Sequence, residues 1–517
     1  MAVTDAASLL PFAAVVLPAV SIPLLYLART RPNVREAVTL AAAAATLVVV
    51  WFMTESATTH VAALGSVAGV AFELRADAAG LLFALLAATL WVVTSVYSIG
   101  YVRTLDEHAQ TRYFASFAAS VAATMGVAFA ANLFTLFVFY ELLTLATYPL
   151  VAHAETREAR IAARKYVAYT LGGGVVALGG VLLVAVLAGT VTFDAGGLSS
   201  LAAADPTLAR VAFALLVVGF GVKTAVMPLH GWLPAAMVAP TPVSGLLHAV
   251  AVVKSGVFAL GRTVLYVFGP ETTWDLGMGL PLAVAAAVTM VLAGVVGLRQ
   301  DNLKRGLAYS TVSQLSYVAL GLALATPLSV FGAFVHVVAH AFMKITLFFV
   351  AGVVAAETGV KYVSDLAGIG RRLPLTMAAF GVAAAGLIGF PLVAGFVSKF
   401  HLVLGAAASP YPVFVAAYLL AGLLKLLYFW PVVYVAFFGR RGSDGSESEH
   451  AFAPPHATDG GYAAAATWER RTLGAETTPF MLLPVLFTVG AAVALGVAPT
   501  AFPFWDLANA VVAEVFG

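Results

Sequence analysis

The sequence predicts an all-α polytopic membrane protein with about fourteen transmembrane helices, and two observations support this prediction. Of the 517 residues, 62% are hydrophobic and only 10% are charged, whereas a soluble protein carries about 25% charged residues. The apolar residues also form runs of the ~17–25 residues that a helix needs to cross a bilayer. The chain contains no cysteine, which excludes thiolate metal sites, iron–sulfur clusters and disulfides.

The fourteen apolar runs follow one another along most of the chain. Their approximate bounds are 8–28, 36–54, 79–102, 112–130, 133–152, 161–189, 208–227, 240–266, 276–298, 307–326, 329–356, 374–407, 411–438 and 479–500. The twelfth is too long for one simple crossing, so we expect two half-helices that meet near Pro391. The seventh has a similar break at Pro228, followed by Pro234, because proline interrupts the hydrogen bonds of a helix.

Lysine and arginine are concentrated in alternate connections between these runs. By the positive-inside rule the odd-numbered connections are cytoplasmic, so both termini lie outside and the protein is expected in the cell (plasma) membrane. The connection 439–478 contains RRGSDGSESEH and has too little apolar surface to pack. We therefore expect a mobile cytoplasmic loop there, with docking of a partner as the alternative.

The two discontinuous helices, seven and twelve, lie five helices apart. Each carries a lysine near its break, Lys223 before Pro228 and Lys399 after Pro391. Paired broken helices are typical of transporters built from inverted repeats. We therefore expect five parts: helices 1–3 (1–105), a first repeat of helices 4–8 (112–266), a second of helices 9–13 (276–438), the loop 439–478, and helix 14 with a tail (479–517).

Ionisable residues inside the apolar runs are the candidates for function, because a charge at bilayer depth costs roughly 2.5–3.5 kcal/mol. Glu141 lies well inside the fifth run. Alone it would take up a proton, because desolvation disfavours the charged carboxylate, but a lysine partner would keep it ionised. Lys223 is the natural partner, and the pair would act as an electrostatic switch. The alternative is a static ion pair that holds two helices together.

His248 and Lys254 lie six residues apart on the eighth helix, about 120° apart around its axis, and could border one cavity. His248 could instead form an interior hydrogen bond to Ser244.

His336, His340 and Lys344 share one stripe of the eleventh helix at i, i+4 and i+8. This spacing favours a proton relay through water. Interior hydrogen bonding is one alternative. A metal site is another, which the lysine would oppose and which lacks the glutamate of an HExxH motif.

The break places Lys399 near mid-membrane, where snorkelling to the interface is the alternative. Four further residues are weaker candidates: Lys165, His230, Lys304 and Lys425. Lys165 could link to Glu141 or snorkel, and Lys304 could be a simple positive-inside anchor.

Several phrases resemble the proton-translocating antiporter-like family, which comprises the large membrane subunits of respiratory complex I and of Mrp-type cation/proton antiporters. They are PLHGWLPAAMVAPTPVSGLLHAVAVVKSGVF, FYELLTLATYPL, DNLKRGLAYSTVSQLSY, HVVAHAFMKITLFF and GFPLVAGFVSKFHL. The similarity runs from about 77 to 440. It implies fourteen helices, two inverted five-helix repeats, outer termini and a central hydrophilic axis.

The resemblance also implies roles by position: a switch pair, a central lysine, connecting histidines and a terminal lysine. These are, in that order, Glu141 and Lys223, Lys254, His248 with His336 and His340, and Lys399. Within the family, VSDLAGIGRRLP and AGFVSKFHL look most like the D-type branch of Mrp proteins, whereas LLHAVAVVK mixes features of the A-type and D-type branches.

We therefore expect a transporter subunit that conducts protons in a multisubunit monovalent cation (Na⁺)/H⁺ antiporter. Its partners would be other subunits, the lipid bilayer, protons and Na⁺ or K⁺, with no nucleic acid, metal or cofactor. The alternative is a proton-pumping, non-redox membrane subunit of a complex I-like NADH:quinone or hydrogenase-type oxidoreductase. A third reading is the membrane half of an inorganic-carbon uptake pair.

Overall fold

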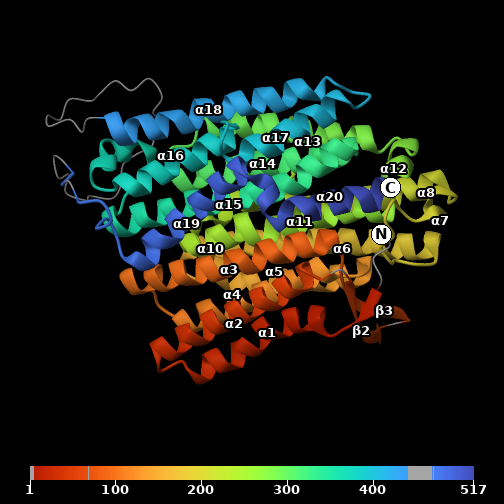
Figure 1. Cartoon of the computed structure of the whole chain (residues 1–517), viewed down its shortest axis with the longest axis horizontal. Helices are drawn as coiled ribbons and strands as arrows, with labels where there is room; N and C mark the ends of the chain where they lie inside the picture. The colour runs from red at the N-terminus through yellow and green to blue at the C-terminus, as the bar shows by residue number, and fades with distance from the viewer. Residues whose placement is uncertain (1–4, 57, 68, 440–467, 470) are drawn as a thin grey trace.

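The structure is a computed structural model that describes residues 5–439 apart from 57 and 68, together with 468, 469 and 471–517. Its long helices lie side by side and run along the longest axis of the molecule (Figure 1). Within the described residues, 12 helical segments are long and apolar enough to cross a membrane. The prediction of a polytopic helical membrane protein is therefore confirmed.

The long helices before the seventh break are α1 (Leu10–Leu27), α2 (Pro32–Thr54), α3 (Ala78–Thr104), α4 (Gln110–Phe129), α5 (Leu133–Val151), α6 (Arg157–Ala188) and α8 (Pro206–Thr224). The next crossing is continuous but irregular. It consists of α10 (Thr241–Gly245), the π-helical turn η2 (Leu246–Val250), α11 (Val252–Arg262) and a second π-helical turn, η3 (Thr263–Val267).

The remaining long helices are α13 (Gly279–Gly297), α14 (Leu303–Leu324), α15 (Pro327–Thr358), α16 (Pro374–Ile388), α17 (Ala394–Ala407), α18 (Phe414–Phe438) and α19 (Pro479–Val497). Short helices connect them: α7 (Ser199–Ala202), α9 (Trp232–Ala235), η1 (Ala236–Val238), α12 (Pro270–Asp275), η4 (Val363–Leu366), η5 (Ile369–Arg371) and η6 (Pro499–Ala501). Every predicted run coincides with a helix, except that 374–407 forms the two shorter helices α16 and α17. The 12 candidate spans include neither that pair nor α4, so the count of fourteen crossings stays a prediction.

Both predicted helix breaks are present, and polar groups near each break satisfy the freed backbone. Helix α8 ends where Ala225 adopts a left-handed conformation, and the indole of Trp232 donates to the carbonyl of Val222 over 2.8 Å. Helix α16 ends at Gly389, whose φ of 108° favours glycine. Unpaired backbone at membrane depth needs such partners. Helices seven and twelve are thus discontinuous, as predicted.

Besides the short helices in the connections, a sheet and a C-terminal helix were not predicted. A small sheet of β1 (Asp5–Ala7), β2 (Thr59–Val67) and β3 (Val70–Ala76) has β1 parallel and β3 antiparallel to β2. The predicted C-terminal tail contains α20 (Pro503–Phe516), which packs against α3 and α15. With 14 residues, α20 is too short to be recognised as a membrane span. The sheet and the end of α20 lie at the same end of the bundle (Figure 1).

The core of the bundle is formed by the crossing Thr241–Val267 together with α14 and α15. In their most apolar windows 94–100% of the residues are buried, against 33% for α1. The helices that carry most of the predicted functional residues are therefore shielded from lipid by the others.

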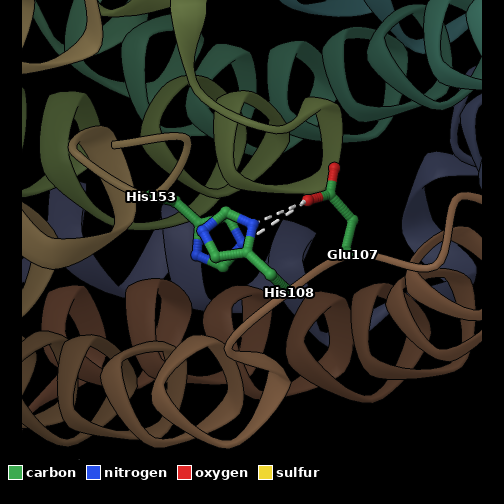
Figure 2. Close-up of side chains that lie close together, drawn as sticks. All are labelled: Glu107, His108 and His153. Atoms are coloured by element: carbon green, nitrogen blue, oxygen red, sulfur yellow. Dashed lines mark ion pairs between the residues drawn. The ribbon is translucent and has the colours of Figure 1, made fainter. Parts of the chain in front are cut away.

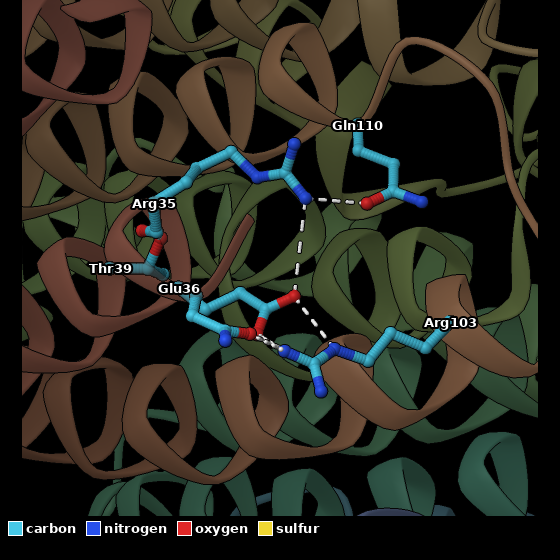
Figure 3. A network of polar contacts seen from close by, with 6 residues as sticks. Arg35, Glu36, Thr39, Arg103 and Gln110 are labelled. Carbon is cyan, nitrogen blue, oxygen red and sulfur yellow. Dashed lines mark hydrogen bonds and ion pairs between the residues drawn. The ribbon is translucent and has the colours of Figure 1, made fainter. Parts of the chain in front are cut away.

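Basic residues near the start of α2 and the end of α3 form a network that the positive-inside rule does not predict. Arg35 is buried and donates to the side-chain oxygen of Gln110 over 2.5 Å, and Arg103 binds both carboxylate oxygens of Glu36 (Figure 3). These contacts tie α2 to the end of α3 and the start of α4.

Most of the predicted loop 439–478 lies outside the described residues. Near its end, the buried carboxylate of Glu476 accepts hydrogen bonds from the backbone N–H groups of Leu375 and Thr376 and from the Thr376 hydroxyl. This carboxylate satisfies the free donors at the start of α16, as a capping group does. The end of the segment is therefore anchored to the bundle.

Candidate functional site

Lys223 lies in the last turn of α8, immediately before the break, and is completely buried. Its ammonium donates to the backbone carbonyl of Tyr140 on α5 and lies 3.4 Å from the centroid of the Tyr140 ring. A cation over an aromatic face is attracted by the negative face of the ring. Backbone oxygen and ring together offset part of the cost of burying this charge.

Glu141 follows Tyr140 directly, and its carboxylate packs against Gly174 of α6, where a Cβ atom would collide with it. The charges of Glu141 and Lys223 act on each other. They form no ion pair within 4.0 Å among the described residues, because the lysine binds the neighbouring carbonyl instead. Oε1 of Glu141 has no hydrogen-bond partner there, so this oxygen is free to accept a proton or a water.

Lys254 on α11 contacts His340 on α15: the ammonium nitrogen lies 2.7 Å from Nδ1 of the imidazole, and both side chains are completely buried. Nε2 of His340 has no partner in the described part of the chain. Gly256, also on α11, packs directly against the backbone of Lys223 and Thr224. The absence of a Cβ there brings the two lysine-bearing helices together.

His248 lies in the π-helical turn η2 and is completely buried. Its ring packs against Phe348 at 4.9 Å, and neither ring nitrogen has a partner among the described residues. The alternative of a hydrogen bond to Ser244 is wrong, because that hydroxyl contacts the carbonyl of Pro240. The π-helical turn also changes the spacing, so the predicted 120° angle to Lys254 does not apply.

His336 forms two interior hydrogen bonds, as the alternative reading of this stripe expected, with partners that the sequence did not indicate. Its Nδ1 lies 2.8 Å from the Ser398 hydroxyl on α17, and its Nε2 lies 2.8 Å from the side-chain oxygen of Gln314 on α14. The Gln314 amide nitrogen donates to the carbonyl of Leu387, which fixes the orientation of that amide. Because the Gln314 oxygen only accepts, Nε2 of His336 carries a proton. Nδ1 contacts the Ser398 hydroxyl, which also lies within hydrogen-bond distance of the carbonyls of Ala394 and Gly395.

Lys344, the third member of the predicted stripe on α15, is also completely buried. Its ammonium donates to the carbonyl of Leu307 over 3.1 Å and to the hydroxyl of Ser310, both on α14. The charges of Lys344 and Lys254 act on each other. The stripe therefore faces the interior, with a different partner for each residue.

Lys399 and Lys425 lie near the same aromatic ring. Their ammonium nitrogens are 4.8 Å and 4.3 Å from the centroid of Tyr317. Lys399 donates to the carbonyls of Leu387 and Ile388, the free acceptors at the C-terminal end of α16. A cation is stabilised there by the helix dipole as well.

Lys425 is the residue that sequence reasoning undervalued. It is completely buried, and its ammonium donates to the Ser313 hydroxyl over 2.9 Å and to the carbonyl of Ala421 over 3.3 Å. The charges of Lys399 and Lys344 act on it. Its position inside an apolar run was the sequence feature that could have indicated function. It was given little weight because no helix break and no histidine or acidic residue lies next to it in the sequence.

The weaker candidates lie around the first break. Lys304 donates to the carbonyl of Ala239 over 2.5 Å, so it holds the segment before α10. Lys165 is exposed, and its ammonium lies 3.3 Å from where Gly231 would carry a Cβ atom. The ring of His230 lies 6.1 Å from that of Tyr309. The structure thus places these three beside the broken segment rather than on the central chain of contacts.

Most of the segments that carry these residues are shared with known proteins. A family model described as the transmembrane region of NADH:quinone oxidoreductase and Mrp antiporter proteins matches residues 130–424. The N-type membrane protein of the NADH-quinone oxidoreductase from Desulforudis audaxviator is 34% identical over 388 residues, which covers 75% of this chain and 76% of that protein. The chain belongs to this antiporter family.

Other antiporter-family members resemble the chain over part of their length. The A-type component of the Na⁺/H⁺ antiporter from Alkalihalophilus pseudofirmus is 33% identical over 350 residues, but the match covers only 42% of that protein. One protein of the Mrp complex from Dietzia sp. DQ12-45-1b superimposes with a TM-score of 0.81 at 27% identity, covering 98% of this chain and 52% of that one.

The fold is also shared with a more distant solved structure. One protein of the archaeal membrane-bound sulfane sulfur reductase superimposes with a TM-score of 0.82, covering 98% of both chains at 23% identity. With its buried lysines and its family membership, this protein is a proton-translocating antiporter-like membrane subunit of the kind found in Mrp and complex I-like assemblies.

Proposed function

We propose that this antiporter-family subunit conducts protons within a multisubunit monovalent cation (Na⁺)/H⁺ antiporter. Protons would pass along a buried axis that starts at Glu141 and Lys223, continues through Lys254 and His340, and ends at Lys399. The proposal rests above all on the 2.7 Å contact between Lys254 and His340, which joins two basic groups in the enclosed centre of the bundle.

Two basic groups in direct contact cannot easily both be protonated, because like charges this close in a low dielectric repel each other strongly. One proton is therefore shared between the Lys254 amine and the His340 imidazole. Transfer from the ammonium to Nδ1 leaves a neutral amine and an imidazolium whose unpartnered Nε2–H can donate onward. A proton-conducting role explains this costly pair, since a static core would not need it.

His336 supports onward transfer towards the second break. Its ring centroid lies 6.2 Å from that of His340, and its hydrogen bond to Ser398 leads to α17, where Lys399 is the next residue. Among the described residues no direct hydrogen bond joins the two rings, so transfer between them would pass through a bridging water, which is a normal part of a polar network in a protein interior. Lys399, held by the carbonyls at the end of α16, is the terminal group of the proposed axis.

At the other end, Glu141 and Lys223 act as the switch. A proton that reaches the free Oε1 of Glu141 neutralises the carboxylate and removes its attraction for the Lys223 ammonium. The lysine is then held only by Tyr140 and can release its proton towards Lys254. These changes in the charge of Glu141 and Lys223 would couple proton movement to the movement of a cation in the opposite direction.

The proposed arrangement consists of two inverted repeats, 112–266 and 276–438, with both termini outside and the loop 439–478 in the cytoplasm. The breaks after α8 and α16, each beside a lysine, support the repeats. The position of the sheet and the end of α20 at one end of the bundle supports a common side for the termini (Figure 1). We assign the chain to the D-type branch of Mrp proteins, assembled with the other components of the antiporter.

A second candidate function is favoured by one observation. The match to the Desulforudis audaxviator protein covers 76% of that protein's length, and that protein is named as part of an NADH-quinone oxidoreductase. In that setting the same axis would pump protons, driven by redox chemistry in partner subunits.

The decisive experiment reconstitutes the assembled complex in vesicles and measures Na⁺-driven proton movement with a pH-sensitive dye. We expect exchange in the wild type, its loss in Lys254→Ala, and no change in Lys361→Ala, which removes an exposed lysine outside the axis. Wild-type activity in Lys254→Ala would overturn the proposed axis. Proton movement that depends on NADH oxidation, and not on a Na⁺ gradient, would favour the second candidate.

A further inference from the structure

A compact group of three potential metal ligands lies away from the proton axis, at the opposite end of the bundle from the sheet (Figures 1 and 2). Glu107 and His108 belong to the connection between α3 and α4, and His153 belongs to the connection between α5 and α6. Within the described ranges, this is the one group of three such side chains close enough to hold a metal ion. None of them was a candidate in the sequence analysis.

The ligand atoms of the three side chains converge. Oε2 of Glu107 lies 3.6 Å from Nε2 of His153 and 3.9 Å from Nδ1 of His108, and all three ligand atoms lie within 4.8 Å of one another. The two imidazole rings stack with their centroids 4.8 Å apart, and both present a nitrogen to the same carboxylate oxygen (Figure 2).

His153 provides the independent sign of a ligand. Its side chain is fully buried, yet neither ring nitrogen has a hydrogen-bond partner among the described residues. An imidazole buried without partners loses its hydration and gains nothing in return. The 3.6 Å between Nε2 of His153 and Oε2 of Glu107 is too long for a hydrogen bond. The imidazole therefore points at the carboxylate without bonding to it, as it would if an ion were to lie between them.

The surrounding charge is compatible with a cation. Arg112 is a fixed positive charge beside His153, and its guanidinium pairs with Glu155 over 2.5 Å and donates to the backbone carbonyl of His153. The Glu155 carboxylate therefore offsets the charge of Arg112.

We propose that Glu107, His108 and His153 bind a divalent transition-metal ion, with Zn²⁺ as the ion that best fits the donor set. Two imidazoles and a carboxylate are a common set of zinc ligands, and three protein ligands leave a fourth position for water. A softer, thiolate-dependent ion is not favoured by these donors, nor is Mg²⁺ or Ca²⁺, which prefer oxygen ligands.

The distances are close to those of a bound site. In a tetrahedral zinc site with bonds of ~2.05 Å, neighbouring ligand atoms lie about 3.4 Å apart. The exposed His108 and the part-exposed Glu107 can close the remaining gap of at most about 1.4 Å, while the buried His153 stays in place. Metal binding would join the α3–α4 connection to the end of α5, the helix that carries Glu141.

The test measures Zn²⁺ binding to the full chain, purified with a tag that contains no histidine, by competition with a chromophoric chelator. We expect one tightly bound Zn²⁺ per chain in the wild type. Affinity should fall at least tenfold in Glu107→Gln and in His108→Ala. Asp106→Asn, which removes an exposed carboxylate from the same connection, should bind like the wild type.

Substitution of His153 could disturb folding because the ring is buried, so a spectroscopic arm uses the intact chain. Co²⁺ bound in place of Zn²⁺ should show the strong visible absorption of a four-coordinate site, and His108→Ala should lose it. The proposal is overturned by the absence of a bound Zn²⁺ in the wild type. It is equally overturned if Glu107→Gln and His108→Ala bind as tightly as Asp106→Asn. These readouts do not depend on transport.

Discussion

The ammonium of Lys254 and the imidazole of His340 lie 2.7 Å apart, although the two residues are separated by 86 positions in the sequence. Both are completely buried, in the two segments whose membrane-spanning windows are 100% enclosed by the rest of the bundle. Burying a pair of basic groups at such a position costs much free energy of desolvation, so we expect the protonation of this pair to control transport.

His340→Gln should lower proton transport at least tenfold while the complex still assembles. Glutamine can accept a hydrogen bond from Lys254 but cannot carry a proton onward. The measurement is dye-detected proton movement in vesicles, normalised to the amount of assembled complex. The control is His60→Gln, which changes another buried histidine, on β2 and outside the axis. Equal activity in the two variants would contradict a relay at His340.

Gly174→Ala should reduce transport strongly, because the new methyl group would occupy the space of the Glu141 carboxylate. Gly172→Ala is the matched control, since its Cβ would meet no atom within 4 Å. Both changes favour the helical state by a similar ~1 kcal/mol, so helix propensity cannot explain a difference between them. Exchange rates of the two reconstituted variants, compared at equal protein, provide the check. A normal rate for Gly174→Ala would contradict the switch role of Glu141.

Lys425→Met should lower transport several-fold, because it removes one of the two ammonium groups that face Tyr317 and changes the field at Lys399. Methionine keeps most of the side-chain volume, which limits the loss of packing. Leu426→Met is the control, because Leu426 is exposed on the outer face of α18. The transport rates of both variants are measured in reconstituted vesicles. An unchanged rate in Lys425→Met would show that this lysine has a purely structural role.

Glu476→Ala should destabilise the protein without touching the axis. The carboxylate accepts three hydrogen bonds at the start of α16, and replacing a helix-capping side chain by alanine costs roughly 0.5–2 kcal/mol in total. We expect a loss of about 2 kcal/mol, measured as a lower midpoint of thermal unfolding in detergent. Glu469→Ala, which changes an exposed glutamate of the same segment, should unfold like the wild type. Identical midpoints for the two variants would argue against the capping role.

The long helices and both breaks were predictable from local properties of the sequence. A run of apolar residues has few options in a bilayer, because every backbone polar group must be paired within the segment. Proline and glycine then locate the interruptions, as at Pro228 and Gly389. The short elements were not predicted by this reasoning, because α20 is shorter than a membrane span and the sheet of β1–β3 lies outside the apolar runs.

The buried charges were predictable as a set, but their partners were not. Lys223, Lys254 and Lys399 stood out because a lysine in an apolar run is costly. The π-helical turn at His248 invalidated the angle calculated from an ideal helix, and the links of His336 to Gln314 and Ser398 join three different helices. No local pattern contains those contacts.

The sequence by itself determined which segments form apolar helices and which of them carry charge, because hydrophobicity and desolvation cost are properties of each residue and its close neighbours. Only the tertiary structure decided which charges meet. Three contacts depend on how distant segments pack: Lys254 with His340, Lys223 with Tyr140, and His153 with Glu107. Packing is set by all the facing side chains together rather than by any one segment.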